Sequence, residues 1–362
     1  MQLPITGHPL HTRSLTLVLT RLDAGRVRAR GVVNDLRKCG FVPMNYGIQP
    51  AGLIHQMSID LTLDLESRRI ESLETDQPFI AIEPSAGTKG ECCRDPSGHL
   101  DTLVGETIDA GFPRKLSAVF GGPRGCSHML TLFQLMTSAI PRALDREAAL
   151  LAELGAEREA GERLFWRSGF LDGFEAEDGS IELAVQLHDF HGRPQVGLAG
   201  PLDRFHRQDE MRVFARVSSP GLGIESLVAA ERIRERTTLA SAEWRDLAAE
   251  VAPLVGTPLI PGLAGRIFKR FGADLETELL RDALLQLAPG QIQAMAAITD
   301  RWFVQAAEAK ARGEGNIRTA LADPQDGPPI GAIGGKADSC WMWRSGGPLA
   351  SERFRRPSNE DG

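Results

Sequence analysis

The stretch 54–65 reads IHQMSIDLTLDL, and its apolar and polar residues alternate strictly. Met57, Ile59 and Leu61 fall on one side, and the polar residues between them fall on the other. A period of two residues is typical of a β-strand with one buried and one solvated face. His55 is in phase with the apolar set. The stretch therefore predicts a strand that turns a histidine toward the core.

The surrounding sequence returns in a second form about 150 residues later. The matches hold two constant offsets, 154 and then 151 residues, which predicts an internal duplication. The matching segments are Arg13-Ser14 with Arg167-Ser168, Asp35 with Asp189, 70–73 (IESL) with 224–227 (IESL), 103–105 (LVG) with 254–256 (LVG), and 120–121 (FG) with 271–272 (FG).

Each half places strand-like alternation first and helical periodicity last. In the first half, helical spacing runs from Met129 to Ile140; in the second, one helix ends at Pro289-Gly290 and another follows. This order favours an α+β fold over a doubly wound parallel sheet. We expect an internally duplicated α+β protein in which each half is a mainly antiparallel sheet followed by helices, and the halves pack as a pseudo-dimer. The expected divisions are 1–150, 151–312 and a flexible tail over 313–362.

Composition narrows the functional classes. The net charge is −7, apolar residues make up 42% of the chain, and no extended basic run occurs, so nucleic acid is not an expected partner. An apolar leader and an 18-residue apolar run are both lacking, which predicts a cytoplasmic protein without a membrane partner. A small molecule is the partner that this composition leaves open, and so is a second copy of the chain in a homodimer.

The two halves differ where chemistry is expected. Residues kept in both are interpreted as scaffold, and residues kept in one as site candidates. The first-half residues without a like counterpart are His11, Tyr46, His55, Cys126 and His128, opposite Phe165, Gly200, Asp209, Thr277 and Leu279.

His55, His128 and Tyr46 are the predicted catalytic residues. Burial on an apolar face keeps the His55 imidazole neutral and able to act as a general base, although a core histidine satisfied by a carbonyl fits equally. His128 lies at a predicted helix start, where the positive helix end also favours the neutral ring. Tyr46, the sole tyrosine, is a candidate acid in a loop, or an ordinary packed side chain.

His11, Arg13, Lys38 and Cys126 are the predicted substrate-binding residues. Arg13 recurs as Arg167, so a structural ion pair is its first interpretation, and carboxylate binding remains open. The helix start would promote a Cys126 thiolate, and a nucleophilic role for it is a weaker alternative. No metal site is predicted: Cys92-Cys93 lacks a second ligand pair at zinc spacing, and the second-half histidines are poorly phased.

Three motifs carry a family resemblance. They are His11-Thr12-Arg13, the run 52–57 (GLIHQM), and 124–129 (RGCSHM). In this order they resemble the bacterial family catalogued as domain of unknown function 2889, over about residues 8–145. Ser127 and Met129 depart from the family's usual GCTHL. The resemblance implies no settled activity, but an association with the catabolism of aromatic compounds.

The leading functional hypothesis is a cofactor-independent lyase that acts by proton transfer on a hydrophobic, aromatic small molecule. Two reactions need a base and a proton donor but no cofactor. One is elimination, and the other is retro-aldol-type loss of a small carbonyl fragment from a phenolic, lignin-derived substrate. His55 would be the base, Tyr46 or His128 the acid, and Arg13 or Lys38 would orient an anionic substituent. The alternatives are a non-catalytic ligand-binding or assembly protein, and a metal-dependent hydrolase.

Overall fold

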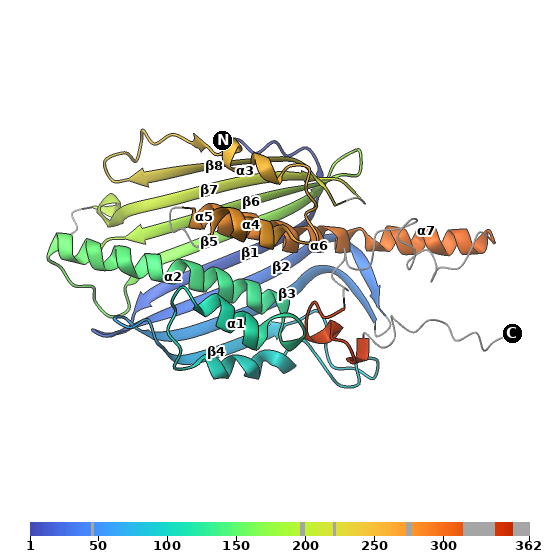
Figure 1. Cartoon of the computed structure of the whole chain (residues 1–362), viewed down its shortest axis with the longest axis horizontal. Coiled ribbons are helices and arrows are strands. Elements are labelled where there is room, and N and C mark those ends of the chain that lie inside the picture. The colour runs from blue at the N-terminus through green and yellow to red at the C-terminus, as the bar shows by residue number, and fades with distance from the viewer. Residues whose placement is uncertain (45–46, 196–199, 220–221, 273–276, 314–336, 350–362) are drawn as a thin grey trace.

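The computed structural model describes residues 1–44, 47–195, 200–219, 222–272, 277–313 and 337–349. Within them, nine antiparallel strands form one sheet in the order β4-β3-β2-β1-β5-β6-β7-β8-β9 (Figure 1). The strands are β1 (His8–Arg21), β2 (Arg26–Met44), β3 (Gly47–Asp64), β4 (Ile70–Phe79), β5 (Arg163–Glu175), β6 (Ile181–Gly192), β7 (Phe205–Val217), β8 (Ile224–Glu235) and β9 (Arg245–Asp246).

The strand β3 has one buried and one more exposed face, as its alternating sequence predicts. Met57, Ile59 and Leu61 are fully buried, while Ser58 and Asp60 between them are partly exposed. The buried side chains meet helices on one face of the sheet, because only that face is covered. The prediction of a mainly antiparallel sheet accompanied by helices is confirmed.

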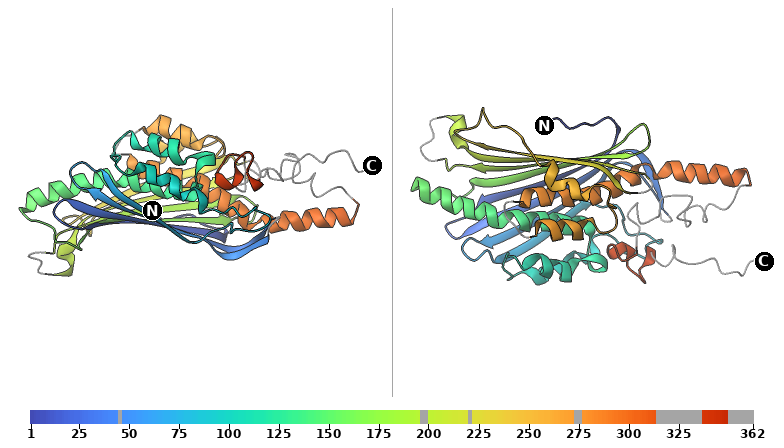
Figure 2. Two further views of the ribbon diagram at one scale, coloured as in Figure 1. Left: turned by 90° about the horizontal axis from the view of Figure 1, so that it is seen from below. Right: turned by 45° about the horizontal axis from the view of Figure 1, so that its top comes forward.

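The helices gather on one face of the curved sheet (Figure 2). The α-helices are α1 (Phe112–Phe120), α2 (Ser127–Leu154), α3 (Ala248–Val251), α4 (Leu263–Phe271), α5 (Glu278–Leu285), α6 (Leu287–Ala297) and α7 (Thr299–Ala311), and the short 3-10 helices are η1 (Asp95–Leu103), η2 (Gly122–Arg124), η3 (Pro201–Arg204), η4 (Ala252–Leu254) and η6 (Trp341–Trp343). No helix of the described residues is long and apolar enough to cross a membrane.

Two apolar cores lie between the sheet and the helices. One holds buried side chains of β1–β3, α1 and α2, and the other those of β6–β8 and α3–α6. The strands β1 and β5 pair along almost their whole length, so the sheet continues from one core to the other. The helix α6 packs near the middle of the sheet, against β2, β1, β5 and β6.

Two glycines let α6 approach the sheet closely. A Cβ on Gly290 would lie 2.6 Å from a methyl carbon of Leu171 in β5. Gly40 in β2 has φ of +69°, and a Cβ there would lie 2.0 Å from the Ala297 carbonyl oxygen. Any larger residue at either position would push α6 away from the strands, so these contacts help to fix its side chains over β2.

Two sequence predictions need correction. Pro289-Gly290 does not end a helix, since both residues lie in the first turns of α6, where proline costs no backbone hydrogen bond. The expectation of a flexible tail over 313–362 is wrong for residues 337–349. There, η6 packs Met342 and Trp343 against Ile82.

Candidate functional site

Three buried polar residues form a row across neighbouring strands of the first half. Arg13 in β1 lies directly opposite Asp35 in β2, and Asp35 lies directly opposite His55 in β3. All three side chains point to the helix-covered face, and Asp35 is fully buried. The prediction that His55 turns inward is confirmed.

Asp35 is held as an anion. Arg13 donates from Nε to Oδ1 at 2.8 Å and from Nη2 to Oδ2 at 3.1 Å, and His11 Nε2 donates to Oδ1 at 3.1 Å. Burial raises the pKa of the Asp35 carboxyl, but Arg13 and the histidines outweigh it and keep that pKa well below its usual range. The ion-pair interpretation of Arg13 therefore holds in the geometry.

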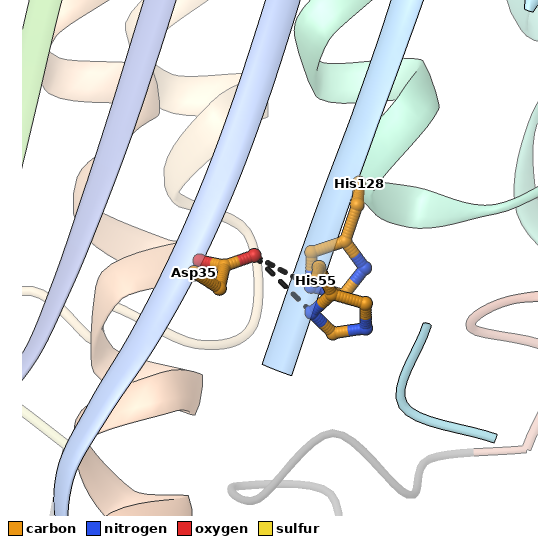
Figure 3. A group of neighbouring side chains, drawn as sticks. All are labelled: Asp35, His55 and His128. Atoms are coloured by element: carbon orange, nitrogen blue, oxygen red, sulfur yellow. Dashed lines mark ion pairs between the residues drawn. The ribbon is translucent and has the colours of Figure 1, made fainter. Parts of the chain in front are cut away.

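Two histidine rings meet beside this carboxylate (Figure 3). Asp35 Oδ2 is 3.3 Å from His55 Nδ1 and 3.5 Å from His128 Nε2, and the ring centroids are 3.8 Å apart at 32°. Burial is the main cause that lowers the pKa of His128 far below its ordinary value, and His55 adds to it. His128 is thus a neutral ring at physiological pH.

The second nitrogen of each ring faces away from Asp35 (Figure 3). His55 Nδ1 lies 3.3 Å from Asp35 Oδ2 but is not aligned for a hydrogen bond, and it has no other partner among the described residues. A base oriented in this way by a buried carboxylate presents its other nitrogen to a reactant. Catalytic hydrogen bonds are commonly long before substrate binds.

The start of α2 places His128. A Cβ on Gly125 would lie 2.1 Å from the Phe120 carbonyl oxygen, so only glycine permits this tight entry into the helix. Gln293 Nε2 of α6 donates to His128 Nε2 at 3.1 Å, which leaves the ring proton on Nδ1. Gln293 belongs to the second half of the chain, and no local pattern in the sequence could single it out.

Both histidines border a cavity of about 290 Å³. Its walls come from β2, β3, the start of α2, α6 and η6, and most of its lining side chains are apolar, among them Val42, Ile54, Ile260, Ile292 and Trp341. The backbone N–H of Trp341 donates to the Gly125 carbonyl at 2.8 Å, which fixes this tail residue to the loop before His128.

The cavity brings most of the predicted residues together. Arg13, His55, Cys126 and His128 line it, and His11 lies behind them on Asp35. Tyr46 lies outside the described residues. Sequence reasoning missed three residues on the cavity wall, namely Arg37, Gln293 and Trp341.

Lys38 does not face the cavity, and Cys126 lines the cavity without the expected thiolate. Lys38 is out of phase with Asp35 on β2, so it points to the opposite, exposed face and lies 3.8 Å from Asp172. Cys126 carries no thiolate, because burial raises the pKa of its thiol to about 11 and outweighs the helix start. Its Sγ lies 3.9 Å from His128 Nδ1.

Asp35, His55 and His128 also form a possible metal-ligand group, which the sequence analysis did not predict. Their ligand atoms all lie within 4.8 Å of one another, and two imidazoles with one carboxylate suit zinc or iron. The charges oppose this, because Arg13 already occupies both oxygens of Asp35. A divalent ion would add two buried positive charges beside a pair that is already balanced.

Comparison with known proteins supports the family resemblance. Residues 11–141 match the model of a family described as Protein of unknown function (DUF2889). This match contains His11, Arg13, Asp35, His55 and His128. No curated protein and no solved structure matches the chain.

Proposed function

We propose that this protein is an enzyme that transfers protons within an apolar cavity, and specifically a cofactor-independent lyase for a hydrophobic aromatic molecule. The observation that carries the proposal is the contact between His55 and His128 beside a buried, ionised Asp35. A neutral imidazole oriented by a carboxylate is the usual arrangement of a general base.

His55 is the proposed base. Its Nδ1 is directed at Asp35, so its other nitrogen is free to take a proton from a bound molecule. Asp35 then stabilises the imidazolium that forms. His128 is the proposed hydrogen-bond donor: its neutral ring, in contact with His55, can bind the negative charge that develops on the substrate, and the His55 imidazolium returns its proton to the product.

A retro-aldol-type cleavage balances with these two groups alone. His55 removes the hydroxyl proton of a hydroxymethyl group, and the oxygen's electron pair forms the C=O bond of the departing aldehyde. The carbon–carbon bond breaks, and its electron pair stays on the aromatic fragment. That fragment takes a proton at carbon, or expels an aryl oxygen that takes the proton instead. The net change is one proton moved, without an oxidant or reductant.

The second half of the chain supports a division of labour. Arg167, Asp189 and Asp209 form the corresponding row on β5, β6 and β7, with an aspartate where the first half has His55. We interpret the halves as a duplicated scaffold with one active copy. The second half still supplies Gln293 and other α6 residues to the cavity.

The test is release of formaldehyde from lignin-derived phenolic dimers that carry a hydroxymethyl group. We expect turnover by the intact chain and a loss of about 100-fold or more in His55→Gln and His128→Gln, the usual worth of a general acid or base. The matched control is His8→Gln, since His8 is exposed on β1 away from the cavity.

The rival is a non-catalytic binding protein. It predicts that none of these dimers is converted, while the cavity still binds aromatic ligands equally well in the three variants. That combination of results would replace the lyase proposal.

A further inference from the structure

Arg37 is a buried cation on the cavity wall. It follows Asp35 by two residues in β2, so it shares the same covered face, and only 3% of it is exposed. Burial lowers the pKa of Arg37 to about 10, which leaves its guanidinium charged at neutral pH. A buried charge is costly unless another charge balances it.

No carboxylate of the described residues pairs with this guanidinium. Arg37 donates from Nη1 to the Gln49 carbonyl at 2.9 Å and from Nη2 to Gln49 Oε1 at 2.8 Å. Its buried Nε–H has no acceptor in the same described parts of the chain. Gln49 is itself fixed through Nε2 to the Ala81 carbonyl at 3.1 Å, so the guanidinium is held in place with donors to spare.

The other buried groups at the cavity offer Arg37 no counterion in direct contact. Arg13 and Asp35 balance each other, His128 is neutral, and the thiols of Cys93, Cys126 and Cys340 have pKa values raised by burial. Asp300 and Asp35 attract the Arg37 guanidinium without forming an ion pair with it, so Arg37 is the cation of the described lining that has no carboxylate in direct contact.

We propose that the cavity binds an aromatic carboxylate, with the carboxylate on Arg37 and the ring against the apolar wall that includes Ile54 and Trp341. A planar guanidinium with free N–H groups matches a carboxylate better than it matches a neutral oxygen. The inference rests on the proposed function only in taking this cavity as the substrate site. The inference adds that the aromatic substrate carries an anionic group, and that Arg37 binds this group in place of the predicted Arg13 or Lys38.

The experiment measures binding of trans-cinnamate and of its neutral isostere trans-cinnamamide by isothermal titration calorimetry. The intact chain is expected to prefer the carboxylate about tenfold or more, as for a desolvated charged pair. Arg37→Gln is expected to remove that preference and leave the weaker amide binding unchanged. Arg28→Gln is the matched control, because Arg28 lies on the exposed face of the same strand and pairs with Asp60.

Equal affinity of the intact chain for both ligands, or undetectable binding of cinnamate, overturns the inference even where Arg37→Gln fails to fold. A preference that survives in a folded Arg37→Gln variant overturns it as well. His55→Gln separates the two proposals: it keeps the cinnamate preference if the anion site is right, whether or not the chain proves to be a lyase.

Discussion

Asp35 Oδ2 lies 3.3 Å from His55 Nδ1, because the two residues are directly opposite each other on β2 and β3. The same carboxylate is bound on its other side by Arg13. Asp35 therefore contacts both its ion-pair partner in β1 and the histidine in β3 that is proposed as the base. In the second half the third position is Asp209, which pairs with Arg142 and Arg146 of α2. The third residue of each row therefore decides whether the row is only ionic or also carries an imidazole.

Replacing Asp35 by Asn tests how much the fold depends on this row. Asn keeps the shape but leaves Arg13 as a buried, unbalanced charge, which is expected to lower the free energy of unfolding by about 3–5 kcal/mol. Urea unfolding followed by circular dichroism measures it. Asp60→Asn is the control, because its partner Arg28 is exposed and such pairs contribute about 1 kcal/mol or less. Equal losses in the two variants would contradict the assigned role of Asp35.

The neutral state of His128 can be observed directly. Because burial lowers its pKa well below the ordinary value, its ring is expected not to take up a proton between pH 7.5 and pH 5. Nitrogen–proton NMR of the eight histidines follows this, with the His128 signal assigned by its absence in His128→Gln. A midpoint near the ordinary histidine pKa of about 6.5 would show a solvated ring and weaken the proposed mechanism.

The sequence predicts those parts of the site that follow strand periodicity. Alternation places His55 inward, and the constant offset pairs it with Asp209, at the matching register position of β7. Arg37 was equally accessible to this reasoning, since it shares the phase of Asp35. Gln293 and Trp341 were not, because their positions depend on how α6 and η6 pack across the sheet, which no local pattern encodes. Lys38 shows the reverse error, a charged residue chosen without regard to its phase.

Trp341 is expected to contribute to ligand binding although it follows the undescribed segment 314–336. Trp341→Ala removes an aromatic wall of the cavity and should weaken trans-cinnamate binding about tenfold, or about 1.4 kcal/mol. Trp244→Ala is the matched control, since the Trp244 ring contacts Arg212 and Arg232 and does not line the cavity. If both variants bind like the intact chain, η6 is only a packing element.

Metal content separates the lyase from a metal-dependent hydrolase. Because Arg13 occupies both oxygens of Asp35, we expect the purified protein to hold less than stoichiometric zinc or iron, and EDTA to leave turnover unchanged. Elemental analysis by mass spectrometry measures the first. One metal ion per chain, lost in both Asp35→Asn and His128→Gln, would instead identify Asp35, His55 and His128 as its ligands.

Glu278 in α5 should make stability fall as the pH rises. Arg167 is surrounded by Asp189, Asp282 and Glu278, so one guanidinium faces three buried carboxyls. Burial, with Asp282 adding to it, raises the pKa of Glu278 to about 7. The folded chain therefore holds a proton that the unfolded chain releases between about pH 4.5 and 7, and stability is lost across that window by up to about 1.4 kcal/mol per pH unit.

Glu278→Gln, which is always neutral, should flatten this dependence in urea unfolding at pH 5 to 8. The exposed Glu225→Gln should leave it unchanged, and a slope shared by Glu278→Gln and the intact chain would show that Glu278 does not hold this proton.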